Sequence, residues 1–148
     1  MRRDGTDMTD LSHRIRVFVY RYSARQPSYL LLRSVQGIES FWTPIHGPLG
    51  FGEKLEAAIR REVMDDTGIG KPAELIDLQM PARWLVGDEE IIEWNFGFQA
   101  ATRHAEPQLD PRRWADFRWA TFSEAYPSLE LEMDRAAIMR LHALLHAA

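Results

Sequence analysis

The clearest pattern in the sequence is HGPLGFGEKLEAAIRREVMDDTGIG, residues 46–70, in which a glycine-rich loop leads into one amphipathic helix. We expect the helix to span residues 53–67 and to end at Gly68, because glycine readily adopts the left-handed conformation that closes many helices. Pro72 follows a few residues later and cannot continue a helix. At about 100° per residue, the apolar positions that share one side and predict the buried face are Leu55, Ala58, Ile59 and Val63.

Three carboxylates occupy the last turns of this helix. Glu62, Asp65 and Asp66 stand at i, i+3 and i+4, so they share a face, and that face overlaps the apolar one. Like charges gathered near a core are costly unless a cation neutralises them. A divalent cation would explain the arrangement, and ligation by carboxylates alone favours the hard ions Mg²⁺ and Mn²⁺. The alternative is a surface cluster in which Arg60 and Arg61 form ordinary salt bridges with the acids.

The spacing of the whole stretch resembles the Nudix box. The family pattern is a glycine, five residues, a glutamate, seven residues, Arg-Glu, an apolar residue, any residue, two glutamates, any residue, a glycine and an apolar residue. The matching positions in this chain are Gly47, Glu53, Arg61, Glu62, Val63, Asp65, Asp66, Gly68 and Ile69. Every position agrees except the paired glutamates, which are both aspartates here, so the chain is identified as a member of the Nudix family.

The resemblance implies an α+β fold of the Nudix type, an α/β/α sandwich with a mixed sheet. It also implies an enzyme that uses Mg²⁺ or Mn²⁺ to hydrolyse a nucleoside diphosphate linked to another group, by attack of water on phosphorus. Glu62 and Asp66 match the family's principal metal ligands, and Asp65 matches a neighbouring acid that helps to place metal or water. In relatives the loop carbonyl just before the first glycine of the box joins the coordination, and here that residue is His46.

Other positions are expected to build the site or to contact the substrate. Gly47 lies where the loop must turn tightly, and Gly68 ends the helix. Glu53 and Arg61 match a pair that holds the loop to the helix by an ion pair, and Arg61 is also a candidate substrate ligand. Arg33 ends a predicted strand near the box, so it is a second candidate for contact with a phosphate.

Two departures from the family pattern affect the site. Aspartate in place of glutamate at positions 65 and 66 shortens each side chain by one methylene, so we expect weaker or altered metal binding. His46 stands where a glycine is usual, so the backbone of the loop must differ from that of relatives.

Many relatives also carry a catalytic glutamate outside the box, and in those with a late E-H-x-x-Y-x-W stretch it falls six residues before the tryptophan. Counting back from Trp119 reaches Arg113, which cannot act as a base. The remaining candidates for this outer acid are Asp110, Asp116, Glu89, Glu90 and Glu93. Strand alternation favours an outward-facing side chain for Glu93.

The rest of the chain alternates strands with helices. Apolar alternation and β-branched residues predict strands at 14–22, 29–34, 73–86, 89–101 and 115–122, and helical spacing predicts a second helix at 133–146. The first two strands are expected to form a hairpin. Residues 34–48 and 103–113 contain proline and polar residues that indicate loops. This order of elements predicts a mixed sheet flanked by helices.

The composition is that of an ordinary globular protein. With 148 residues, 45% of them hydrophobic, the chain fits one domain, expected at residues 13–148 after a flexible leader at residues 1–12. The net charge of −4 argues against nucleic acid as the main partner. No apolar run approaches the ~20 residues that span a bilayer, and the N-terminus lacks the apolar part of a secretory signal. The absence of cysteine fits a reducing compartment, so we expect a cytoplasmic protein.

Two functions of different class follow from these observations. The first is a Mg²⁺-dependent pyrophosphohydrolase acting on a nucleoside triphosphate or a similar compound, since EWNFGFQA (93–100) and DFRWATFSEA (116–125) resemble the dATP or dihydroneopterin-triphosphate pyrophosphatase group. The second is a catalytically weakened Nudix-fold module that binds a nucleotide, motivated by the paired aspartates and the missing outer glutamate. Dinucleoside polyphosphates and ADP-ribose are further candidate substrates. Dimers are common in the family, so a homodimer is also compatible with the resemblance.

Overall fold

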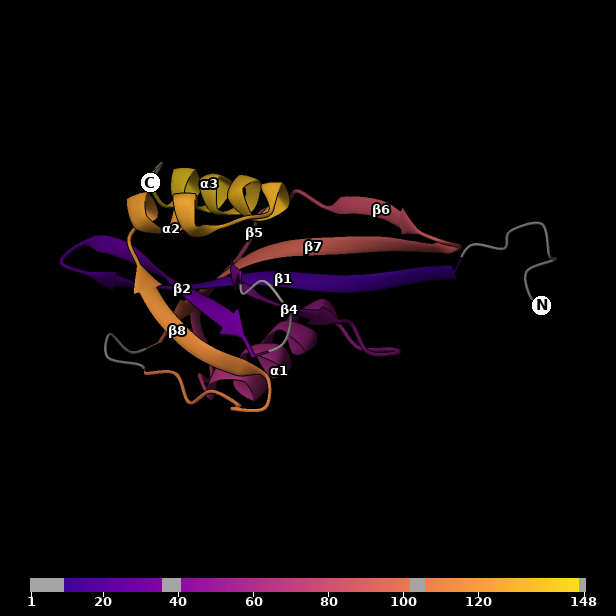
Figure 1. Ribbon diagram of the computed structural model, residues 1–148, viewed down its shortest axis with the longest axis horizontal. Helices are drawn as coiled ribbons and strands as arrows, with labels where there is room; N and C mark the ends of the chain where they lie inside the picture. The colour runs from indigo at the N-terminus through magenta and orange to yellow at the C-terminus, as the bar shows by residue number, and fades with distance from the viewer. Residues whose placement is uncertain (1–9, 36–40, 102–105, 147–148) are drawn as a thin grey trace.

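A mixed β-sheet lies between helices in the computed structural model, which describes residues 10–35, 41–101 and 106–146 (Figure 1). In order along the chain, the elements are β1 (Asp10–Ser23), β2 (Gln26–Ser34), β3 (Trp42–Thr43), β4 (Ile45–Pro48), α1 (Leu55–Thr67), β5 (Pro72–Asp77), β6 (Ala82–Val86), β7 (Glu89–Ala100), β8 (Trp114–Ala120), α2 (Phe122–Ser128) and α3 (Glu132–His146). Of the expected leader, residues 1–9 lie outside the described residues, and residues 10–12 belong to β1.

The sheet has the strand order β3-β2-β1-β7-β5, with β4 paired to β1, β6 to β7 and β8 to β2. Strands β1 and β7 run parallel, with Ile15 opposite Trp94, and β1 pairs with β2 as the expected antiparallel hairpin. Strand β1 shares one edge between two partners, because residues 14–17 pair with β4 and residues 20–23 pair with β2. This division brings β4, which carries His46 and Gly47, next to the first half of β1.

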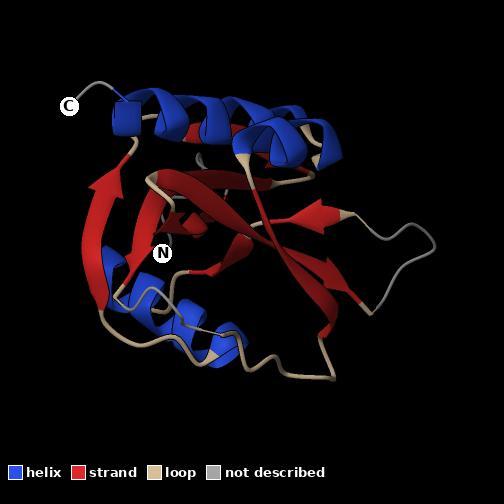
Figure 2. Cartoon of the chain, turned by 90° about the vertical axis from the view of Figure 1, so that its left-hand side faces the viewer, coloured by secondary structure: helices blue, strands red, loops and turns tan. Residues whose placement is uncertain are grey.

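Helices cover both faces of the sheet (Figure 2). Alternate residues of β1 enter two separate cores: Ile15 and Val17 pack in the cluster that contains Ile59 of α1, whereas Phe18 packs in the cluster that contains Leu141 of α3. Burying a large apolar side chain is worth about 1.5–3 kcal/mol, so both cores hold the layers together. The expected α/β/α sandwich with a mixed sheet is confirmed. None of the described helices is long and apolar enough to cross a membrane.

Several predicted elements differ from the structure. The strand predicted at 73–86 is divided into β5 and β6, with Gln79 at a φ of 55° in the break between them. The loop predicted at 34–48 contains the short strands β3 and β4. Helix α2 was not predicted, because Pro127 obscures its pattern, although Thr121 and Glu124 form a capping box at its start. The central helix begins at Leu55, two residues later than expected.

Candidate active site

The C-terminal half of α1 brings two acids into the interior of the protein. Glu62 is 4% exposed and Asp66 is fully buried, on the same side of the helix as Ile59 and Val63. The helix ends at Gly68, whose φ of 72° is left-handed and whose N–H donates to the carbonyl of Met64 at 2.8 Å. The predicted cap is therefore confirmed, as is the overlap of the Glu62 and Asp66 side chains with the apolar face.

Asp65 differs from the other two acids because its side chain is exposed. At about 100° per residue, the buried arc of α1 runs from Ala58 through Glu62 and Asp66 to Thr67, and Asp65 falls just outside its edge. The prediction that all three acids share one inward face is therefore wrong for Asp65. It holds for Glu62 and Asp66.

The carboxylate of Glu62 packs against the backbone of β4. A Cβ atom added to Gly47 would lie 2.5 Å from the Glu62 carboxylate carbon, so only glycine leaves room at this position. Glu62 also accepts a hydrogen bond from its neighbour, since Arg61 Nη1 donates to Glu62 Oε2 at 2.8 Å. Gly47 lies within strand β4, opposite Ile15, so the tight turn expected at this position is wrong. Its lack of a side chain serves the site by leaving room for the end of Glu62.

Asp66 receives one strong contact from a distant part of the chain. Arg113 Nη1 donates to Asp66 Oδ1 at 2.6 Å, and the other carboxylate oxygen, Oδ2, is buried with no hydrogen-bond partner among the described residues. Burial raises the pKa of Asp66 to about 6, while the charge of Arg113 and the indole of Trp114 act in the opposite direction. Asp66 thus keeps one buried oxygen whose bonding capacity is unused.

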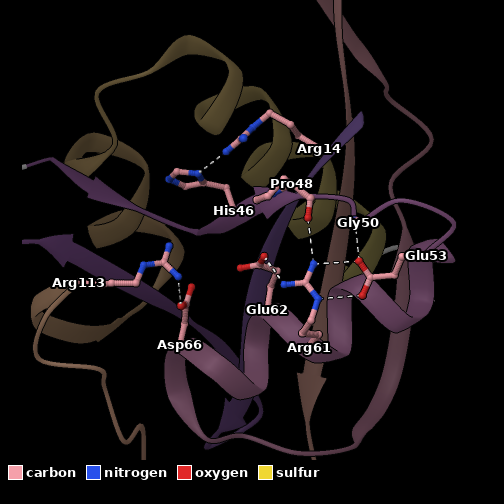
Figure 3. Close-up of polar contacts among 9 residues, drawn as sticks. All are labelled: Arg14, His46, Pro48, Gly50, Glu53, Arg61, Glu62, Asp66 and Arg113. Atoms are coloured by element: carbon pink, nitrogen blue, oxygen red, sulfur yellow. Dashed lines mark hydrogen bonds and ion pairs between the residues drawn. The ribbon is translucent and has the colours of Figure 1, made fainter. Parts of the chain in front are cut away.

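Arg61 joins the loop to the helix, as Figure 3 shows. Its Nε and Nη2 donate to the two carboxylate oxygens of Glu53 at 2.8 and 3.0 Å, and Nη2 also donates to the carbonyl of Pro48 at 3.0 Å. The N–H of Gly50 completes the arrangement by donating to Glu53 Oε1 at 2.8 Å. Hydrogen bonds from Arg61 and Gly50 lower the pKa of Glu53 to about 2. The expected ion pair between Glu53 and Arg61 is present, and a role for Arg61 in binding substrate stays a prediction.

His46 and Gly47 are adjacent in β4, so their side-chain positions lie on different faces of the sheet. His46 pairs across the strands with Arg16 of β1. Arg14 Nη2 approaches His46 Nδ1 at 3.4 Å (Figure 3). Burial, followed by the charges of Arg16, Arg14 and Arg113, lowers the pKa of His46 to about 4, so the imidazole is neutral at pH 7. Coordination of a metal through the His46 carbonyl stays a prediction.

Arg33 is engaged away from α1. Its Nη2 lies 3.5 Å from Asp116 Oδ2, and its guanidinium carbon lies 5.2 Å from the centre of the Trp42 ring. Arg118 lies against the same ring at 5.1 Å. A contact between Arg33 and a phosphate stays a prediction.

Each of the five candidates for an outer acid has another partner. The pairs are Glu89 with Ser12, Glu90 with Arg83, Glu93 with Arg16, Asp110 with Arg112, and Asp116 with Arg33. The outward orientation predicted for Glu93 is wrong, since its side chain is 1% exposed. Helix α3 covers that face of the sheet, and its Asp134 joins Glu93 in a buried ion-pair cluster around Arg16.

The position six residues before Trp119 is occupied by the residue that touches Asp66. Counting along the sequence excludes Arg113 as a base and gives it no other role. The structure places its guanidinium on a buried acid 47 positions earlier in the chain. This contact was not predicted from the sequence, in which the two residues are 47 positions apart.

A pocket of about 220 Å³ adjoins Arg113, and its lining residues are Ser34, Thr43, His46, Arg112, Arg113 and Trp114. A larger pocket of about 560 Å³ lies between the start of β1 and the loop that follows β4, and neither Glu62 nor Asp66 lines it. Neither acid lines the smaller pocket either, but Arg113, which does, contacts Asp66. Within the described residues, no three histidine, aspartate or glutamate side chains form a group that could hold a metal ion by themselves.

Taken together, a mixed sheet between helices and two buried acids at the end of a glycine-loop helix define the class of Nudix proteins. The chain matches the NUDIX domain over residues 12–142. It therefore belongs to the Nudix family.

Solved structures share this fold at low sequence identity. A putative NUDIX hydrolase from Listeria monocytogenes superimposes with a TM-score of 0.77 at 14% identity, covering 90% of this chain and 93% of that one. The Ap4A hydrolase of C. elegans gives 0.72 at 18% identity, covering 93% and 99% of the two chains. The dihydroneopterin triphosphate pyrophosphohydrolase of E. coli gives 0.72 at 21% identity, covering 89% and 95%. No curated protein shows significant sequence similarity to the chain.

Proposed function

We propose that this protein hydrolyses a pyrophosphate bond in a nucleoside triphosphate or a similar nucleoside diphosphate-linked compound, with the help of a divalent cation. The observation that carries the proposal is the burial of Glu62 and Asp66 on one side of α1, next to the glycine of the preceding loop. Each carboxylate is paired with one arginine, Glu62 with Arg61 and Asp66 with Arg113, and each pair occupies one carboxylate oxygen.

The donor set fits a hard divalent cation. Asp66 offers a buried oxygen without a hydrogen-bond partner, and Glu62 lies on the same face one helical turn earlier. Mg²⁺ commonly binds through one or two carboxylates and fills its other positions with water and substrate phosphate oxygens, so a third buried protein ligand is not required. When bound, such an ion offsets phosphate charge and lowers the pKa of coordinated water. Glu62 and Asp66 are the residues that would hold it.

The neighbouring residues position these acids. The Glu53–Arg61 pair fixes the loop against the helix, and Arg61 also holds one oxygen of Glu62. Gly47 admits the Glu62 carboxylate. Asp65 is exposed and makes no hydrogen bond or ion pair with the described residues, so its carboxylate is free to orient a water molecule or a hydrated ion.

The substrate class is drawn from both the sequence and the structural relatives. Two of the relatives carry names that refer to Ap4A and to dihydroneopterin triphosphate, each of which contains linked phosphates. Nucleoside triphosphates are our first choice, and dinucleoside polyphosphates and ADP-ribose are the alternatives within the same class of enzyme. The chemistry common to all of them is hydrolysis between two phosphorus atoms.

A second function is favoured by one observation. Arg113 places a positive charge on Asp66 where many relatives have an outer glutamate, which suits a module that binds a nucleotide without turning it over. Such a protein would be stabilised by a nucleotide and would release no phosphate from it.

A nucleotide panel distinguishes the two functions. Each compound is incubated with Mg²⁺ or Mn²⁺, and phosphate is measured after addition of an inorganic pyrophosphatase. We expect turnover of at least one compound, and Glu62→Gln should lower it by at least about a hundredfold because a metal ligand is lost. The matched control is Glu56→Gln, on an exposed position of the same helix. Absence of turnover together with thermal stabilisation by a nucleotide would instead support the binding module.

A further inference from the structure

The pocket next to Asp66 has the composition of an anion site. Arg112, Arg113, Ser34 and Thr43 belong to its lining, and no carboxylate among the described residues does. Arg112 also pairs with Asp110, and the Thr43 hydroxyl donates to the Pro44 carbonyl. Trp114 also lines the pocket, but its indole faces the carboxylate of Asp66, whose pKa it lowers. Arginine in this setting suits phosphate, because its planar donors match two phosphate oxygens at once.

His46 adds a further donor to the pocket. Arginine can only donate hydrogen bonds, so the approach of Arg14 to His46 Nδ1 at 3.4 Å makes Nδ1 the acceptor. A ring nitrogen that accepts carries no proton, so the ring proton resides on Nε2. A neutral histidine with a protonated Nε2 can donate to a phosphate oxygen.

Arg113 is held by its backbone at the border between this pocket and Asp66. Its N–H donates to the carbonyl of Asp110 and its carbonyl accepts from Val35 N–H, both at 3.0 Å. The loop before it is tied to the end of α1, because Gln108 N–H donates to the Thr67 carbonyl at 2.7 Å. The side chain beyond this fixed backbone is 46% exposed, so the guanidinium can move while the backbone stays in place.

Two cations cannot share Asp66 without repulsion. Arg113 already neutralises one oxygen of this buried acid, and a divalent ion bound there would bring a like charge next to the guanidinium. A phosphate group in the adjacent pocket would supply the negative charge that Arg113 then lacks. Figure 3 shows Arg113 directed toward Asp66. His46 and Arg113 line the same pocket.

We propose that Arg113 is a phosphate ligand of the substrate, which exchanges Asp66 for a phosphate group in this pocket when a divalent cation binds to Asp66. The inference rests on the proposed function and adds to it a binding residue, a subsite and an order of contacts. In the metal-free protein, Arg113 forms an ion pair with Asp66. In the loaded protein, the same side chain holds the phosphate, so metal and substrate bind cooperatively.

The test uses two ligands that cannot be turned over, Mn²⁺ and methylenediphosphonate, a non-hydrolysable analogue of pyrophosphate. Calorimetric titrations are made with the wild type, Arg113→Ala and the control Arg60→Ala, which removes an equal charge from an exposed position of α1 that pairs with Glu56. We expect Arg113→Ala to bind methylenediphosphonate at least about tenfold more weakly in the presence of Mg²⁺. The same variant should bind Mn²⁺ alone at least about threefold more tightly, because the internal competitor for Asp66 is gone.

These opposite changes separate a ligand role from a structural one. Loss of structure in Arg113→Ala would weaken both ligands together, and that result would overturn the proposal, as would binding of both ligands at wild-type strength. Arg113→Lys keeps the positive charge but loses the bidentate hydrogen bonding of the guanidinium group. Its affinity for the diphosphonate should therefore fall between those of the wild type and Arg113→Ala. Arg60→Ala should match the wild type in both titrations.

Failure of this inference can be distinguished from failure of the proposed function. If nucleotides are turned over in a Glu62-dependent way while Arg113→Ala binds both ligands like the wild type, only the role of Arg113 is refuted. If the wild type neither binds Mn²⁺ nor hydrolyses any nucleotide, the proposed function is refuted as well.

Discussion

A methyl group on Gly47 would lie 2.5 Å from the carboxylate of Glu62, closer than any Cβ can approach. Gly47→Ala should therefore displace Glu62 or strand β4. We expect activity to fall at least about tenfold, since catalytic groups must be placed within a fraction of an ångström. The free energy of unfolding should fall by about 1–3 kcal/mol because of overpacking.

The measurement is steady-state kinetics together with urea unfolding. Gly70→Ala is the matched control, because a Cβ there meets Met64 Cε at an ordinary 3.6 Å. Wild-type kcat in Gly47→Ala would show that the position of Glu62 does not matter for turnover.

Arg61 and Arg60 are neighbours with different expected roles. Arg61 connects Glu53, Glu62 and the Pro48 carbonyl, whereas Arg60 pairs only with exposed Glu56 among the described residues. Lysine is a point charge that cannot make these contacts simultaneously, so Arg61→Lys should lower activity at least about tenfold. Arg60→Lys should remain within about twofold of the wild type, as exposed pairs contribute little. Equal kinetics for the two variants would remove Arg61 from the site.

The buried cluster of Arg16, Glu93 and Asp134 is expected to matter for stability. Removing Arg16 leaves two acids in the interior without their cation, so Arg16→Met should lower the free energy of unfolding by about 3–5 kcal/mol. Adding Glu93→Gln and Asp134→Asn should recover part of this loss, since the uncompensated charges are gone. Urea unfolding of the single and triple variants tests both statements. A loss in Arg16→Met that the triple variant does not reduce would contradict the electrostatic explanation.

The low pKa of His46, about 4 in the folded protein, predicts a pH-dependent stability. The unfolded chain binds a proton at His46 near pH 6.5, and the folded chain does so only near pH 4. Between these values the unfolded state holds more protons, so the contribution of His46 is complete above pH 6.5 and is lost as the pH falls toward 4. The loss amounts to at most about 3 kcal/mol.

The measurement is urea unfolding of the wild type and of His46→Gln at pH 7 and pH 4.5. The wild type should lose more stability than the variant over this interval. Parallel losses in the two proteins would contradict a neutral, half-buried His46.

The central helix and its cap follow from the sequence because their determinants are local. Ile59, Val63 and Gly68 lie within one amphipathic segment, and the expected positions are those in the structure. Asp65 was misplaced because a helical wheel gives an angle and cannot give the edge of the surface that covers the helix. Glu93 was misplaced for a similar reason, since alternation predicts an outward side chain only when that face of the sheet meets solvent, and here α3 covers it.

The contacts that complete the site could not be predicted from one sequence. Arg113 and Asp66 are 47 positions apart, and no periodic pattern connects them. Strands β3 and β4 have two and four residues, too few to show alternation, and Pro44 lies between them. The family pattern supplied the identity of the acids, and the tertiary fold supplied their partners.

The most direct test of the account is the affinity for Mn²⁺, measured by electron paramagnetic resonance from the free ion signal in the absence of nucleotide. We predict that the wild type binds Mn²⁺ and that Glu62→Gln and Asp66→Asn each bind it at least about tenfold more weakly, as expected for the loss of a ligand. The exposed Asp65 should matter less, so Asp65→Asn should remain within about threefold of the wild type. Wild-type affinity in Glu62→Gln and Asp66→Asn would contradict the claim that these two buried acids hold the cation.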